Sequence, residues 1–138
     1  MEYLNSIPTN GQLVPDNKEI NYNFRKILHY GLTEIEPYLW LAEQAKGPLS
    51  NYYHWPNSVY EESIRRAAKS SKAVASYISD SGYILENGFS LADIYYYHIL
   101  TWAKQHNVQH EPATEHYLAR LEQRKYFPQE MNWKHNEI

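Results

Sequence analysis

Residues 88–102, "GFSLADIYYYHILTW", gather side chains that could do acid–base chemistry. Asp93 or His98 could move a proton, and Tyr95, Tyr96 and Tyr97 could hold a polar ligand. Successive helical residues point about 100° apart, so the three tyrosines cannot all face one ligand and are expected in the core and its interfaces. We expect His98 to be a hydrogen-bonded core histidine rather than a general base, because a base needs a partner within hydrogen-bond reach.

The same stretch also has the spacing of a helix start. Ser90 and Asp93 stand at the N-cap and N3 positions, where each side chain can bond the other's backbone N–H. Phe89 and Ile94 occupy the positions of a hydrophobic staple. This capping role explains Asp93 without catalysis, and we predict no catalytic residue in the chain.

The histidines raise the question of a metal site. His106 and His110 are four residues apart, as two ligands on one helical face would be, and His116 follows on the next predicted helix. Asn107 and Pro112 indicate that the helix ends between them, and no HExxH or calcium-loop pattern is present. We therefore predict no metal ligand set.

Composition narrows the class of protein. The chain has 138 residues, no cysteine, a net charge of −3 and 14 tyrosines against 3 phenylalanines. This length supports one buried core, and the absence of cysteine removes disulfides and thiolate catalysis. With no basic block, no signal-like start and no long apolar run, we expect a cytoplasmic protein that binds neither nucleic acid nor membrane.

The elements that position these residues are helices. Asp16 and Glu19 are placed as an N-cap pair for a first long helix, which Pro37 should bend and which should end near Lys46. Its apolar stripe follows a helical period and consists of Phe24, Ile27, Leu28, Leu32, Ile35, Leu39 and Ala42. Arg65, Arg66, Lys69 and Lys72 of the next helix read as solvated surface.

The rest of the chain reads as three further helices and no strand. The chain is therefore an all-α helical bundle, with a linker-like segment 1–16, a helical domain 17–128 and a polar tail 129–138. The expected helices are residues 57–79, 90–106 and one from Pro112 that ends before Pro128.

Three motifs in sequence order resemble one family. The segment 83–108, with Gly88, Phe89, Ser90, Asp93 and Trp102, resembles the central buried helix of the C-terminal domain of glutathione S-transferases. "TEIEPYLW" (33–40) and "PATEHYLARLEQRKYF" (112–127) are similar to that domain's first and later helices. Two departures are Asn87-Gly88 in place of Gly-Asp, and Arg124-Lys125-Tyr126 in place of Arg-Pro-Ala.

The resemblance implies a wall for an apolar co-substrate on the first helix. An aromatic cleft with a few cations suits an apolar ligand with an anionic group. Tyr52, Tyr53 and Trp55 are weaker candidates from the following loop. The residues that the resemblance places on the wall are Tyr22, Arg25, Lys26, His29, Tyr30 and Thr33.

In this family a thioredoxin-like domain binds glutathione and activates its thiol, and residues 1–16 resemble only the end of that domain and its linker. We therefore expect this chain alone to bind no cofactor and to be inactive, with glutathione bound only when a thioredoxin-like domain is supplied in trans. The alternative is a stand-alone module that binds a protein or a small apolar ligand without catalysis.

Partners are expected under either reading. An uncovered apolar surface along Phe24, Tyr30 and residues 3–14 would favour self-association or a partner chain, possibly a thioredoxin-like one. Whether the chain acts as an enzyme stays open at this point.

Overall fold

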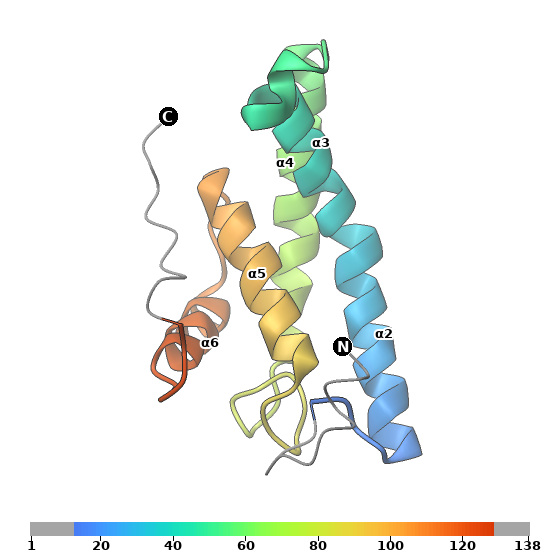
Figure 1. Cartoon of the computed structure of the whole chain (residues 1–138), viewed down its shortest axis with the longest axis vertical. Coiled ribbons are helices and arrows are strands. Elements are labelled where there is room, and N and C mark those ends of the chain that lie inside the picture. The colour runs from blue at the N-terminus through green and yellow to red at the C-terminus, as the bar shows by residue number, and fades with distance from the viewer. Residues whose placement is uncertain (1–12, 129–138) are drawn as a thin grey trace.

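The computed structural model describes residues 13–128, and these residues form a helical bundle (Figure 1). Within 13–128 there is no strand, only an isolated bridge between Leu85 and Gly88. The predicted all-α fold is confirmed. The tail 129–138 and residues 1–12 lie outside the described part. The helices are α2 (Lys18–Glu34), α3 (Glu36–Lys46), α4 (Asn57–Ser71), α5 (Leu91–Gln105) and α6 (Pro112–Glu122), with 3-10 helices η1 (Pro48–Asn51) and η2 (Lys72–Tyr77).

Helix α2 is capped by Asn17 rather than by the predicted Asp16. Asn17 has an extended backbone, and its Oδ1 accepts hydrogen bonds from the N–H groups of Glu19 at 3.0 Å and Ile20 at 3.2 Å. Asp16 therefore lies one residue outside the helix. Asn and Asp are about equally good N-caps, so the sequence favours neither strongly and the geometry decides.

The predicted bend near Pro37 is a complete break. α2 ends at Glu34, Ile35 has non-helical dihedral angles, and α3 begins at Glu36 with Pro37 in its first turn. A proline tolerates this position because the first N–H groups of a helix have no partner within it. Ile35, at the junction, is fully buried.

The second predicted helix is shorter than expected. Regular α-helix ends at Ser71, and residues up to Tyr77 continue as the tighter η2. Hydroxyl groups bond backbone carbonyls in this region, Ser71 Oγ to Ala68 at 3.0 Å and Ser76 Oγ to Ala73 at 2.6 Å. Such local bonds compete with the regular helical pattern.

Helix α5 is the centre of the bundle. It contacts α2, α3, α4 and α6, and Figure 1 shows it running between the α2–α3 pair and α6. Gly31 of α2 allows a close approach, because a Cβ at this position would lie 2.6 Å from Tyr95 Cε1 and 3.1 Å from Ile99 Cδ1. The buried residues of α5 are Ala92, Asp93, Tyr96, Tyr97, Ile99, Leu100 and Ala103.

Candidate functional site

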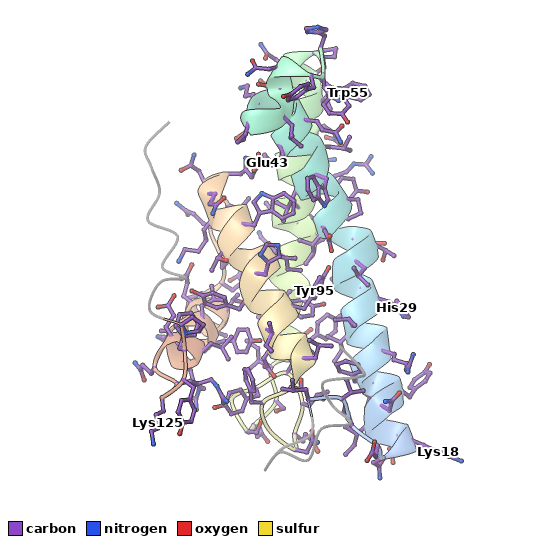
Figure 2. All side chains as sticks on the ribbon, viewed as in Figure 1. Lys18, His29, Glu43, Trp55, Tyr95 and Lys125 are labelled. Atoms are coloured by element: carbon purple, nitrogen blue, oxygen red, sulfur yellow. The ribbon has the colours of Figure 1, made fainter. Side chains whose placement is uncertain are left out.

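Most of the predicted wall residues share one open face of α2. The buried residues of this helix, Phe24 and Gly31, lie seven positions apart on the opposite side. Figure 2 shows His29 on the side of α2 away from α5. The residues of this face, called the α2 face below, are Tyr22, Arg25, Lys26, His29 and Thr33, and all five are exposed.

The α2 face is held by local contacts. Arg25 Nε donates to Asn21 Oδ1 at 2.8 Å, and Thr33 Oγ1 donates to the His29 carbonyl at 2.9 Å. Tyr22 is 70% exposed. The face thus presents a tyrosine ring, two cations and a histidine on a rigid helix. Such a surface can contact an apolar group and a nearby negative charge.

Tyr30, the sixth predicted wall residue, does not join this face. Its hydroxyl donates to the Ser70 carbonyl on α4 at 3.0 Å, and its ring packs edge-on against Tyr77 at 5.4 Å. Phe24 is only 4% exposed. The prediction that Phe24 and Tyr30 form part of an uncovered patch is therefore wrong, because both side chains pack between helices. Residues 3–12, which were expected to continue this patch, lie outside the described part of the chain.

The loop candidates lie at the other end of the molecule. Tyr52, Tyr53 and Trp55 are exposed, and Trp55 Nε1 donates to Gln44 Oε1 at 3.2 Å. Figure 2 shows Trp55 and Lys18 at opposite ends of the longest axis. The fold does not combine this loop with the start of α2 into one site.

Asp93 lies at a buried structural centre. Ser90 is the N-cap of α5, and the capping box with Asp93 is formed in both directions. Asp93 Oδ2 accepts the Ser90 N–H at 2.7 Å and Oγ–H at 3.1 Å, while Oδ1 accepts the Ile84 N–H at 2.9 Å and the Tyr117 hydroxyl at 3.0 Å. Four donors fill the acceptor sites of a carboxylate. Asp93 therefore joins the loop before α5 to α6.

The hydrophobic staple stays a prediction. Phe89 packs edge-on against Tyr83 at 6.0 Å and lies under the Arg124 guanidinium at 3.5 Å. Ile94 is 40% exposed, and both Phe89 and Ile94 line the same cavity.

The three consecutive tyrosines point to different partners, as expected. The hydroxyl of Tyr95 donates to Glu36 Oε2 at 2.7 Å, that of Tyr96 to the Ile27 carbonyl at 2.6 Å, and that of Tyr97 to Glu122 Oε1 at 3.0 Å. Burial is the main cause that raises their pKa values, and it raises the pKa of Tyr97 to about 12. They are helix-packing residues.

The prediction of a core histidine at position 98 is wrong. His98 is exposed, with its ring against Trp102 at 5.8 Å. His106 Nε2 contacts Glu43 Oε1 at 3.0 Å, and His110 Nε2 contacts the Leu100 carbonyl at 2.9 Å. α5 ends at Gln105, before both histidines, and Asn107 follows with φ 61°. Residues 13–128 contain no cluster of three or more side chains suited to hold a metal ion.

The structure has a cavity between α5 and the turn after α6, which the sequence did not predict. Its volume is about 520 Å³, within the range of small-ligand pockets. Arg124 supplies a cation beside apolar walls, and the sequence singled it out only as a departure from a family motif. We call this space the Arg124 cavity. It is lined by Phe89, Asp93, Ile94, Tyr97, His98, Leu121, Arg124, Tyr126, Phe127 and Pro128.

The basic residues of α4 and the start of η2 lie on the surface, as predicted. Arg65 Nε and Arg66 Nε each lie 2.7 Å from a Glu62 oxygen, and Arg66 also donates to the Tyr38 hydroxyl at 3.1 Å. Lys69 and Lys72 are exposed. No helix within residues 13–128 is both long enough and apolar enough to span a bilayer.

Comparisons with solved structures identify the fold. The chain superposes on a glutathione S-transferase from Xanthobacter autotrophicus Py2 with a TM-score of 0.68 and 15% identity, over 86% of this chain. It superposes on a possible glutathione S-transferase from Rhodopseudomonas palustris with a TM-score of 0.70 and 21% identity, over 96% of this chain. The match spans 59% of the length of each of these structures.

A search of curated protein sequences found no match. The family model for the glutathione S-transferase C-terminal domain matches residues 38–125, which is more than half of the chain. This range includes the capped helix α5 and its buried Asp93. The chain therefore belongs to the glutathione S-transferase C-terminal domain family.

Proposed function

We propose that this helical domain supplies the apolar co-substrate wall of a glutathione transferase and is inactive without a thioredoxin-like domain. The observation that carries the proposal is the α2 face, where aromatic and basic side chains stand exposed together on the helix that precedes the matched residues 38–125. Glutathione would be bound by a thioredoxin-like domain, whether covalently joined or supplied as a separate chain.

The chemistry of the α2 face suits that role. Tyr22 offers a flat apolar ring, while Arg25 and Lys26 are cations that can attract an anionic group on an electrophilic co-substrate. Binding at this face would position a co-substrate, and the family's chemistry would come from the partner domain. No proton transfer by the α2 face is part of the proposal.

The Arg124 cavity favours a second candidate, a small-ligand module without catalysis. Its walls are mainly apolar, and the Arg124 guanidinium lies 3.5 Å from the centre of the Phe89 ring. An apolar carboxylate would place its chain against Phe89 and its charge near Arg124.

We also propose association with a partner chain or a second copy. Tyr22 of the α2 face, Leu32 and Trp40 are large apolar side chains that remain exposed along α2 and α3. Exposed apolar surface of this kind favours contact with another protein. Sedimentation at several concentrations tests this, and a monomer at every concentration would contradict self-association.

The enzyme proposal is tested by a conjugation assay with glutathione and 1-chloro-2,4-dinitrobenzene. We expect no activity above the uncatalysed rate from the chain alone. Activity is expected when the chain is joined to the thioredoxin-like domain of a glutathione transferase. An active chain alone would contradict the proposal. A fusion protein that is inactive although both of its domains are folded would favour the small-ligand module. Titration of the chain with a fatty carboxylate then tests that second candidate.

A further inference from the structure

A second cavity lies between α3 and the C-terminal half of α5, apart from the α2 face. Its volume is about 320 Å³, at the small end of the range for ligand pockets. We call it the Glu43 cavity. Figure 2 shows Glu43 between α3 and the end of α5. The cavity is lined by Trp40, Glu43, Pro48, Leu49, His98, Thr101, Trp102 and Gln105.

Two tryptophans form aromatic walls of the Glu43 cavity. The rings of Trp40 and Trp102 meet at 85° with centroids 5.1 Å apart. Trp102 Nε1 donates to Glu43 Oε1 at 2.8 Å, so its N–H is already used. Trp40 is 47% exposed. The faces of the two rings carry negative electrostatic potential and can therefore attract a cationic ligand.

Glu43 is a carboxylate fixed at this wall. Its side chain is 15% exposed, and Oε1 accepts from Trp102 and contacts His106 Nε2 at 3.0 Å. The other oxygen, Oε2, lies where a Cβ on residue 47 would stand, so Gly47 leaves room for the carboxylate. The charge is therefore positioned before any ligand arrives.

No lysine or arginine is among the residues that line the Glu43 cavity. Lys46 Nζ lies over the Tyr60 ring at 4.5 Å, and Lys104 Nζ pairs with Glu115 at 2.8 Å. Lys46 thus lies beside Tyr60, whose hydroxyl is 3.5 Å from His106 Nδ1. A carboxylate beside two tryptophan rings disfavours an anion and attracts a cation.

We propose that the Glu43 cavity binds a small organic cation, an alkylammonium group on an apolar body. The ammonium lies against the tryptophan faces and opposite Glu43, and the apolar body lies against Pro48 and Leu49. Quaternary ammonium groups are recognised elsewhere by aromatic walls of this kind. The Arg124 cavity shares His98 as a lining residue but holds both Arg124 and Asp93, so the charges at the two cavities differ.

This inference goes beyond the transferase proposal, because it uses neither glutathione nor the α2 face. The test is calorimetric and fluorescence titration of the full chain with benzyltrimethylammonium at mildly alkaline pH. Benzyl alcohol is the neutral probe. We expect saturable binding of the cation, and weaker binding of benzyl alcohol by at least about tenfold, which is about 1.4 kcal/mol.

Glu43→Gln removes the charge and keeps an acceptor for the Trp102 N–H, so it should weaken the cation at least about tenfold and leave benzyl alcohol unchanged. Trp40→Leu should weaken the cation to a similar degree. If Glu43→Gln unfolds, Trp40→Leu alone tests the proposal, because Trp40 is 47% exposed and its replacement should leave the fold intact. Trp55→Leu is the matched control, because Trp55 is equally exposed and lies outside the cavity.

Three results would overturn the proposal. The first is the absence of saturable binding of the cation. The second is equal binding of cation and benzyl alcohol. The third is a cation affinity that survives both Glu43→Gln and Trp40→Leu in proteins with wild-type circular dichroism.

Discussion

The hydroxyl of Tyr117 donates a hydrogen bond to Asp93 Oδ1 over 3.0 Å, joining α6 to the first turn of α5 inside the protein. Both side chains are buried. Burial, followed by the nearby Asp93 carboxylate, raises the pKa of Tyr117. This pair gives the sequence motif around Asp93 a role in folding.

Replacing Tyr117 with phenylalanine should destabilise the domain. The variant keeps the buried ring and removes one donor to Asp93, so the free energy of unfolding should fall by about 1–3 kcal/mol. Urea denaturation followed by circular dichroism measures it. Tyr126→Phe is the control, because Tyr126 is 83% exposed and should change stability little. Equal stability of the two variants would contradict a role for the Tyr117 hydroxyl.

Asp93→Ala should cost more than loss of the cap alone. Ser90→Ala removes an N-cap side chain, for which the usual cost is about 1 kcal/mol. Asp93→Ala leaves buried donors of Ser90, Ile84 and Tyr117 without their acceptor, and the expected cost is about 3 kcal/mol or more. Thermal or urea unfolding compares the two. If Asp93→Ala proves no worse than Ser90→Ala, the buried network contributes nothing beyond capping.

Gly31→Ala tests the close approach of α2 and α5. In an open helix this change should stabilise by about 1 kcal/mol. Here the new methyl group would meet Tyr95 Cε1 at 2.6 Å, and the Tyr95 hydroxyl is held by Glu36 at 2.7 Å. Overpacking should therefore dominate, with a net loss of about 1–3 kcal/mol. A variant more stable than wild type would show that the Tyr95 ring moves aside freely.

The buried tyrosines predict a fall of stability in alkali. Burial raises the pKa values of Tyr95, Tyr96 and Tyr117, and that of Tyr97 to about 12. An unfolded tyrosine titrates near pH 10. Below about pH 10 both states hold the phenolic protons, so their contribution to stability is fully present. Between about pH 10 and 12 the unfolded chain releases them first, and the free energy of unfolding should decrease.

Urea titrations across this pH range, with phenolate absorbance recorded in parallel, measure that decrease. Tyr97→Phe removes one of the shifted groups, so its stability should depend less steeply on pH. A free energy of unfolding that stays constant between about pH 10 and 12 would contradict the prediction.

The sequence predicted the helices because their signals are local. Ser90 and Asp93 stand three residues apart, and Pro112 marks a helix start, so these boundaries are encoded within one turn. Pro37 predicted only a bend, whereas a new helix begins at Glu36. The cap of α2 was misplaced by one residue because Asp16 and Asn17 carry similar side chains. The hydrogen bond from Tyr117 to Asp93 could not be predicted from local spacing, because the two residues are 24 positions apart.

The candidate sites were predicted less well, because they depend on the packing of distant helices. His98 was expected in the core because its neighbours are apolar, yet it is exposed on α5 between the buried residues Tyr97 and Ile99. The Glu43 cavity combines α3 with α5, and the bond from Trp102 to Glu43 spans 59 positions. No spacing rule within one helix can indicate such a pairing.

The most direct test of the transferase account compares two matched tyrosines in an active fusion with a thioredoxin-like domain. Tyr22 on the α2 face and Tyr52 at the far end are 70% and 79% exposed. The account predicts that Tyr22→Ala raises the KM for 1-chloro-2,4-dinitrobenzene several-fold with an unchanged KM for glutathione, whereas Tyr52→Ala changes neither. Indistinguishable KM values for the two variants would contradict it.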